Sequence, residues 1–406
     1  MRILQITPRI AWPPTDGGRV VMLQVARALH DLGANVEILS LNPRKQRVDI
    51  AAARKALAPL TFDAIEIDTS ARFAPLLRSF ALRAPQLVAR FFSPRFAAAL
   101  RARLRDHDFD IVQIESPFLL PYLAIIRESS RAPVVLRSLN VEFRIWERLA
   151  ARERNVVRRA AYRAIARSLR RYEIAQINAC DAIVPIAEAD ALDLRALGCT
   201  SPMFVLPAGM AIDPLPSSGS VERPNAIGFL GSLDYRPNQD AALWIAQQLK
   251  PRMRPDLDLH VAGSRAPETL RERLSKCGVT FDGEVEDAAA FVDSMTVMIA
   301  PIFSGGGMRV KILEAMARRK VIVSTAIGAE GIDVTPGENI VIADDADAFS
   351  LAIESLLSDP TRAHAIGQAA RTLVATRYSI LPLVRGLLAF YDQLTKGRSV
   401  NSSGRS

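Results

Sequence analysis

Short apolar runs of β-type alternate with segments of helical period along almost the whole chain. In the first half these runs are Arg2–Thr7, Val36–Leu41, Ile111–Glu115, Val134–Ser138 and Ala182–Ile186. An arginine-rich stretch, Arg144–Gln176, predicts one long helix. Strands that alternate with helices form βαβ units around a parallel sheet. We therefore expect an α/β fold.

The alternation stops over Val205–Asn225, where proline, serine and glycine mark a linker. It then resumes with six further runs, at Ala226–Gly231, Asp258–Ala262, Val279–Phe281, Val297–Phe303, Val321–Thr325 and Asn339–Ala343. Because 406 residues suit two cores, we expect two doubly wound domains, at 1–210 and 225–377, joined by a linker at 211–224. A helix at 378–395 is expected to pack back on the first domain, before a disordered tail at 396–406.

The basic charge lies in the first half. Residues 1–200 carry 31 Lys and Arg against 20 Asp and Glu, whereas residues 201–406 carry 21 against 23. The segment Thr69–Arg105 has eight arginines and no acid, which fits either an anionic membrane surface or a solvated helix face. No nucleic-acid partner is expected, because no binding motif accompanies the charge.

Other compositional features limit the compartment and the cofactors. The chain opens without a signal-peptide pattern and has no apolar run near the ~20 residues that span a bilayer. We expect a cytoplasmic protein, either free or peripheral at the inner face of the plasma membrane. Four scattered histidines and three separated cysteines show no ligand spacing, so no metal or other cofactor is expected.

Two glycine-rich turns stand where strands of such sheets end. Gly17 and Gly18 precede an amphipathic helix, and Gly305, Gly306 and Gly307 precede the helix expected at Val310–Arg319. Backbone amides at a helix N-terminus bind anions, and glycine lets the ligand approach closely. Ligands of doubly wound sheets bind at such strand ends, and we expect the two sets of ends to face each other across a cleft.

Arg309 and Lys311 follow the second turn. Cations at the positive end of a helix are unfavourable unless an anion lies nearby, and they predict a phosphate ligand. Glu314, one turn later, is suited to accept hydrogen bonds from the vicinal hydroxyls of a ribose. The alternative is an ordinary surface pair in which Glu314 bonds to Lys311 or Arg318.

These residues are part of a longer resemblance. "GGGMRVKILEAMARRKVIVSTAIGAEGI" resembles the signature region of the family-4 retaining glycosyltransferases. "LRSLNVEFRIWERLA" is similar to that family's "HNVE" segment, "VLPAGMAID" to its "PNGVD", and "FLGSLDYRPNQDAALW" to the opening of its nucleotide-binding domain. The resemblance covers most of the chain.

The resemblance implies a GT-B architecture of two facing Rossmann-like domains. It also implies retaining, metal-independent transfer of a sugar, of hexose type, from a nucleotide-diphosphate sugar to a saccharide or lipid-linked acceptor, as in surface-polysaccharide biosynthesis. Arg309 and Lys311 would stabilise the leaving diphosphate as catalytic residues. The remaining implied site residues are Gly17, Gly18, Ser232, Gly305, Gly306, Gly307, Met308 and Glu314 for the donor, and Asn140, Glu142 and Glu115 for the acceptor side.

The chain departs from the family's pattern at three places. Gly306 stands where many members have the first of two signature glutamates, and Leu139 stands where the "HNVE" segment has histidine. After the first strand of the second domain, Ser232 and Pro237 or Asn238 stand where many members have Arg and Lys. We expect Arg309 and Lys311 to replace those cations.

Three other functions are compatible with parts of the sequence. A metal-dependent transferase would use a D-x-D motif such as Asp106–Asp110, which is more readily a polar loop. A GT-B epimerase would need catalytic carboxylates and histidines that we cannot place. A catalytically degenerate relative that binds a nucleotide sugar or a partner protein is favoured by Leu139 and Gly306.

Overall fold

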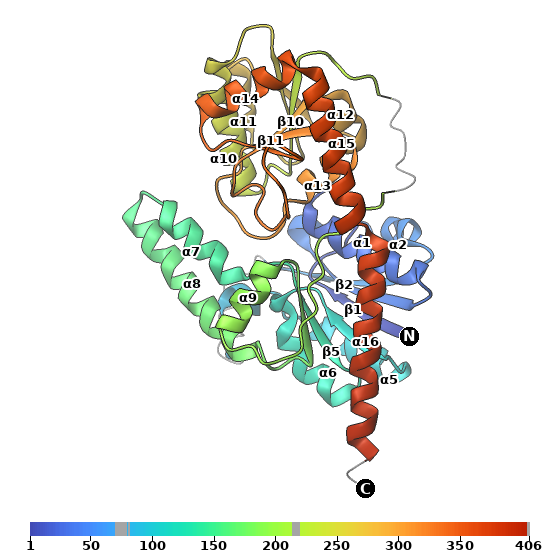
Figure 1. Ribbon diagram of the computed structural model, residues 1–406. Coiled ribbons are helices and arrows are strands. Elements are labelled where there is room, and N and C mark those ends of the chain that lie inside the picture. Colours follow the sequence, from blue (N-terminus) through green and yellow to red (C-terminus); the bar gives the residue numbers. More distant parts are fainter. Residues whose placement is uncertain (70–78, 80–81, 213–219, 404–406) are drawn as a thin grey trace. The chain divides into compact units, whose positions relative to one another are not determined.

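The computed structural model describes residues 1–69, 79, 82–212 and 220–403 (Figure 1). The chain divides into two compact units. The first comprises Met1–Pro14, Gly18–Gly209 and the C-terminal segment from Ile380, and the second comprises Thr15–Gly17 and Met210–Ser379. Each unit is built on one six-stranded sheet whose paired strands are parallel, so the predicted α/β class and the two Rossmann-like domains are confirmed.

The sheet of the first unit has the order β3-β2-β1-β4-β5-β6. Its strands are β1 (Arg2–Thr7), β2 (Asn35–Pro43), β3 (Thr61–Ile67), β4 (Ile111–Ile114), β5 (Val134–Ser138) and β6 (Ala182–Pro185). Its helices are α1 (Gly17–Asp31), α2 (Ile50–Leu57), α4 (Gln86–Ala89), α5 (Pro94–Asp106), α6 (Leu123–Ser129), α7 (Glu142–Arg152), α8 (Val156–Gln176), α9 (Glu188–Ala196) and α16 (Ile380–Ser403), with 3₁₀ turns η1 (Arg44–Gln46) and η2 (Pro117–Tyr122).

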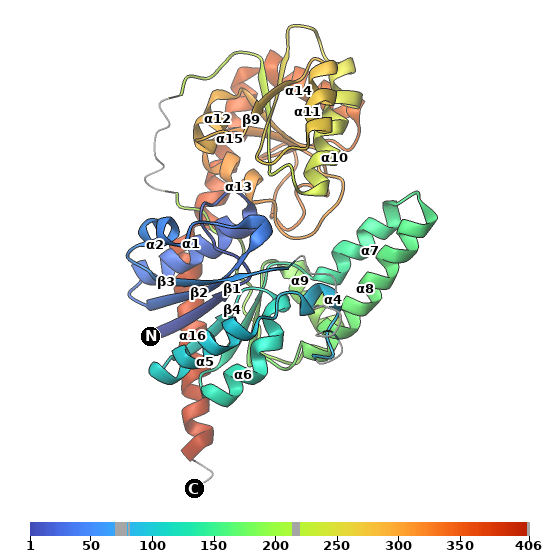
Figure 2. The same ribbon diagram turned by 180° about the vertical axis from the view of Figure 1, so that it is seen from behind.

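Helices cover both faces of this sheet (Figure 2). One face packs against α5, α6 and η2, and the other packs against α1, α2 and α16. Val384, Leu387 and Tyr391 of α16 are fully buried in the second of these clusters. The C-terminal helix therefore belongs to the core of the first unit.

Strand β3 was not predicted. Its side chains alternate between exposed and buried, with Asp63 and Glu66 among them, and it pairs only with β2 at the edge of the sheet. An edge strand buries one face only and therefore lacks the continuous apolar run that identified the other strands.

The single helix predicted over Arg144–Gln176 is wrong. The structure has two helices, α7 and α8, which run side by side (Figures 1 and 2). Asn155 caps α8 by accepting a hydrogen bond from the N–H of Arg158 at 3.1 Å. The turn lets the apolar stripes of the two helices meet, with the rings of Trp146 and Tyr162 5.6 Å apart.

The disordered tail predicted at 396–406 is also corrected, because α16 continues to Ser403. Extending an existing helix needs no new nucleus, so polar residues can continue it. None of the helices in the described ranges is long and apolar enough to span a membrane. Residues 70–78, 80 and 81 of Thr69–Arg105, Arg78 among them, lie outside the described residues.

The sheet of the second unit has the order β12-β11-β10-β7-β8-β9. Its strands are β7 (Ala226–Leu230), β8 (Asp258–Ala262), β9 (Thr280–Gly283), β10 (Val297–Ala300), β11 (Val321–Ser324) and β12 (Val341–Ile342). Its helices are α10 (Arg236–Trp244), α11 (Glu268–Lys276), α12 (Ala288–Ser294), α13 (Val310–Ala317), α14 (Ala346–Ser358) and α15 (Pro360–Arg377), with a π turn η3 (Ile245–Leu249) and a 3₁₀ turn η4 (Lys250–Arg252). All six predicted strands are present, although β10 and β12 are shorter than expected.

Candidate donor-binding site

The glycine-rich loop of the second unit connects β10 to α13. Gly305 has φ +111° and Gly307 has φ +69°, conformations that residues with a Cβ rarely adopt. A Cβ on Gly305 would lie 3.0 Å from the hydroxyl of Tyr235. Glycine is therefore needed here both for the backbone conformation and for the close approach to the segment that follows β7.

Arg309 holds this loop. It occupies the N-cap position of α13, and its guanidinium Nη1 donates to the carbonyl oxygens of Gly306, at 2.7 Å, and of Gly307. The side chain is only 9% exposed. The positive charge is thus fixed beside the loop, at the end of α13 where the helix dipole is also positive.

Lys311 brings a second cation to the same place. Its ammonium donates to Oδ1 of Asn238 at 2.8 Å and lies 4.4 Å from the centre of the Phe229 ring. No ion pair joins it to an acid in the described part of the chain. Burial, with a further contribution from the charge of Arg309, lowers the pKa of Lys311 to about 7.

Gly231 makes room for this lysine. A Cβ at position 231 would lie 2.6 Å from Nζ of Lys311 and 3.0 Å from Cγ of Asn238. A side chain at position 231 would therefore force the ammonium of Lys311, or the amide of Asn238, away from its present place. The ammonium of Lys311 contacts Asn238, which, with Pro237, is one of the two positions matched to a cation of the resembling family.

Glu314 does not form the ordinary surface pair that was the alternative. Lys311 bonds to Asn238, and Arg318 pairs with Asp293 at 2.6 Å. Among the described residues none forms an ion pair with Glu314. Burial raises the pKa of Glu314 to about 7, against the opposing charges of Arg318 and Lys311. The neighbouring Met308 is buried.

Ser232 belongs to a polar cluster that the sequence did not reveal in full. Its Oγ donates to Oδ1 of Asp234 at 2.8 Å and accepts from Nη2 of Arg265 at 3.1 Å. Nε of Arg265 also pairs with Asp234 at 2.9 Å, and Asn238 donates to the carbonyl of Ser232 at 2.8 Å. Arg265 lies 33 residues from Ser232, and only the pairing of β7 with β8 brings the two together.

Glu115 of the first unit is not placed to meet an acceptor. It is 1% exposed, and Oε2 pairs with Arg137 at 3.0 Å. Oε1 accepts hydrogen bonds from Gln5, at 2.6 Å, and from Gln113, and Gln113 in turn accepts from Tyr391 of α16 at 2.6 Å. Both carboxylate oxygens are used, so Glu115 stabilises the core between the sheet and α16.

Asn140 and Glu142 lie together, with a partner that was not predicted. Both are half-buried, and Asn140 hydrogen-bonds to Glu142. Glu173 of α8 accepts from the N–H of Phe143 at 3.1 Å and so caps α7. Burial raises the pKa of Glu142 to about 7, against the charges of Arg9 and Arg90, and burial together with the charge of Glu142 raises the pKa of Glu173 to about 8.

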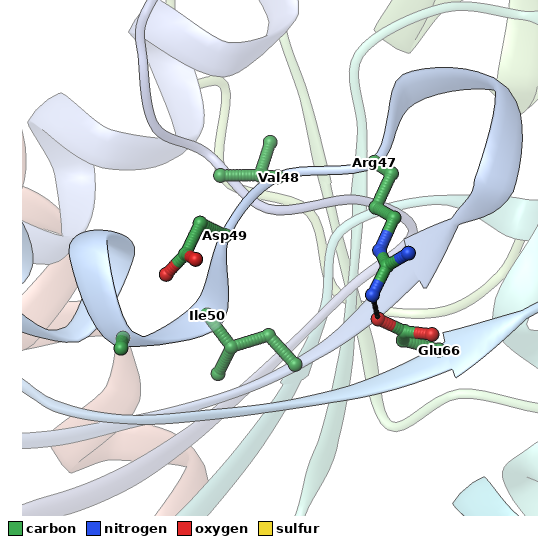
Figure 3. Close-up of a pocket in the computed structure, with 6 residues that line it drawn as sticks. Arg47, Val48, Asp49, Ile50 and Glu66 are labelled. Carbon is green, nitrogen blue, oxygen red and sulfur yellow. Dashed lines mark ion pairs between the residues drawn. The ribbon is translucent and has the colours of Figure 1, made fainter.

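The two glycines of the first unit and a surface pocket add little to the description of the site. Gly17, exposed, and Gly18, half-buried, are the first two residues of α1. A surface pocket of the first unit is lined by Arg47–Ala51 and Glu66, with Arg47 and Glu66 paired at 2.7 Å (Figure 3), and it contains none of the predicted site residues. Within the described ranges, no three His, Cys, Asp or Glu side chains are grouped as metal ligands would be.

Comparison with known proteins agrees with this organisation. A model described as "Glycosyl transferase 4-like domain" matches residues 16–209, and a model described as "Glycosyl transferases group 1" matches residues 224–359. The first match covers the strands of the first sheet except β1, and the second covers the whole second sheet and includes the glycine loop, Arg309, Lys311 and Glu314.

Two curated relatives match parts of the chain. An uncharacterized 44.6 kDa protein in the cps region of Klebsiella pneumoniae is 31% identical over 134 residues, 30% of this chain and 34% of that protein. A lipopolysaccharide core biosynthesis mannosyltransferase, LpcC, from Rhizobium leguminosarum bv. viciae is 30% identical over 118 residues, 29% of this chain and 33% of that protein. The matches thus span about a third of the length of each relative.

The fold is shared over nearly the whole chain. The structure of Anabaena Alr3699/HepE in complex with UDP has a TM-score of 0.70 at 13% identity, covering 97% of this chain and 100% of that one. The same protein with UDP-glucose gives a TM-score of 0.69. The chain therefore has the GT-B fold, and contains a glycosyl transferase 4-like domain at residues 16–209 followed by a glycosyl transferases group 1 domain at residues 224–359.

Proposed function

We propose that the protein transfers a sugar from a nucleotide-diphosphate sugar to a saccharide or lipid-linked acceptor. The observation that carries the proposal is the pair of cations, Arg309 and Lys311, held in the glycine loop of the second unit. One is tied to loop carbonyls and the other to an amide, and burial lowers the pKa of Lys311. Two like charges at a helix N-terminus, one buried and one half-buried, are costly unless an anion binds near them.

The anion that fits is the diphosphate of the donor. Charge develops on this group as the sugar leaves, and fixed cations and backbone amides stabilise such charge best when they are already in place. Lys311 supplies, from α13, the cation that the resembling family has after the first strand of its second domain. The complex of Alr3699/HepE with UDP-glucose supports a donor of this class.

Glu314 is proposed to accept hydrogen bonds from the ribose hydroxyls. Glu314 forms no ion pair in the described part of the chain, so its carboxylate oxygens can accept hydrogen bonds from a ligand. Transfer with retention needs no carboxylate nucleophile if the departing phosphate takes the proton of the acceptor. We propose metal-independent transfer of this kind, at the cytoplasmic face of a membrane, in surface-polysaccharide biosynthesis. The named role of the Rhizobium relative is consistent with that setting.

Release of nucleoside diphosphate tests the proposal. A panel of nucleotide sugars is incubated with the protein, with and without lipid-linked saccharides, in EDTA and again with Mg²⁺ or Mn²⁺. We expect acceptor-dependent release that survives EDTA. Arg309→Ala should lower turnover by about 10²-fold or more, as the loss of one aimed donor does. Arg309→Lys, which keeps the charge but not the fork, should retain more activity.

The outcomes separate the alternatives. Activity abolished by EDTA and restored by Mn²⁺ would favour the D-x-D transferase. Tight binding of a nucleotide sugar without release under any condition would favour the degenerate binding module. One observation supports that module: Leu139 packs against the core of the first unit, so no polar side chain stands where the family has its histidine.

A further inference from the structure

The helix pair α7–α8, residues 142–176, is a strongly basic surface element of the first unit. It contains ten arginines and four acids, a net charge of +6 in 35 residues. In both views the two helices lie side by side, and the end that joins them lies away from the sheet of the first unit (Figures 1 and 2). We call residues 142–176 the basic hairpin.

Three of the arginines of α8 lie on the face opposite its packed stripe. Ala166, Leu169 and Tyr172 are buried, and Tyr162 meets Trp146 of α7. Arg163, Arg167 and Arg171 are exposed, and none of the three forms an ion pair with a described residue. At 3.6 residues per turn they fall within about 80° of one another. The hairpin thus has a packed side and a charged side that no described element of the first unit covers.

Two large apolar side chains stand at the tip of the same element. Val156 and Val157, the first residues of α8, are 66% and 78% exposed, among the most exposed large hydrophobic residues of the structure. Val156 lies on the same face as Arg163 and Arg167, at i+7 and i+11. Exposed valines beside a row of arginines match a bilayer interface, where apolar groups enter the acyl boundary and cations meet the head groups.

We infer that the basic hairpin docks the protein on an anionic lipid bilayer. Charge complementarity selects the occupant, since the exposed face is strongly positive and the apolar tip requires a partner with an apolar interior. The inference moves the membrane surface predicted for Thr69–Arg105 to a different element. It does not depend on sugar transfer, because binding to lipid is measured without donor or acceptor.

Co-sedimentation of the full chain with vesicles of phosphatidylglycerol and phosphatidylcholine tests the inference. The hairpin variant is Arg163→Gln, Arg167→Gln and Arg171→Gln. The matched control removes the same charge from the part of α5 that lies in the Thr69–Arg105 segment. It consists of Arg95→Gln, Arg101→Gln and Arg105→Gln. We expect the hairpin variant to bind about 100-fold more weakly than the native chain at low salt, because three arginines are lost. The control should stay within about twofold, and native binding should weaken from 50 to 500 mM salt.

A second readout follows the apolar tip. In a Cys277→Ser background, Val157→Cys carrying an environment-sensitive dye should shift its emission to the blue when anionic vesicles are added, and not with phosphatidylcholine alone. The inference is overturned if the native chain ignores anionic vesicles, if it binds neutral vesicles equally well, or if the α5 control loses as much binding as the hairpin variant. Docking through the tip is also overturned if the hairpin variant loses binding but the dye at position 157 does not shift when the labelled chain binds anionic vesicles.

Discussion

The lowered pKa of Lys311 makes the affinity for a nucleoside diphosphate depend on pH. In the free protein this lysine titrates near pH 7, and a bound diphosphate should return its pKa toward the ordinary value of about 10.5. Binding then requires the uptake of a proton at any pH between these two values. The Kd for UDP should therefore rise by up to about tenfold per pH unit, or about 50-fold between pH 7 and pH 9. The second pKa of a phosphate is about 6, so this ionisation is nearly complete above pH 7. It therefore contributes little to the pH dependence of the Kd.

Isothermal titration calorimetry measures both quantities. At pH 8, in two buffers of different ionisation enthalpy, the native chain should take up about 0.9 proton for each UDP bound. Lys311→Met keeps the apolar stem and should remove both the uptake and the slope. Glu314→Gln is the matched control, because the pKa of Glu314 is also about 7, and this variant should keep the slope. A native Kd that is equal at pH 7 and pH 9, without proton uptake, would refute the reasoning.

Two further predictions test the geometry of each unit. Gly231→Ala places a Cβ 2.6 Å from Nζ of Lys311, so it should displace the ammonium and weaken UDP binding about tenfold. If Gly231→Ala weakens binding equally in a Lys311→Met background, the effect does not act through Lys311. In the first unit, Glu173 has a folded pKa of about 8 against about 4.5 unfolded, so its contribution to stability is lost as pH rises through that window. Glu173→Gln can still accept from Phe143, and its advantage over the native chain in free energy of unfolding should be larger at pH 9 than at pH 5 by at least about 1 kcal/mol. Urea unfolding at both pH values checks this, and an equal difference at the two pH values would contradict it.

The sequence by itself determined the class of fold and the main parts of the donor site. Each buried strand of a parallel sheet reads as an apolar run, because both of its faces are covered, and the runs therefore predicted all the strands except β3. The glycine triplet, Arg309, Lys311 and Glu314 fall within ten residues, so a local motif was enough to identify them.

Only the tertiary structure decided which residues that are far apart in the sequence belong to the predicted sites and which do not. Lys311 meets Asn238 across 73 residues, and Gly231 leaves the space for it. Glu115 is a carboxylate and was predicted as a site residue, but both of its oxygens are bound by Arg137 and two glutamines. Glu173 reaches the start of α7 only because residues 153–155 reverse the chain. Such contacts depend on packing between segments that are remote in the chain, and no local periodicity records them.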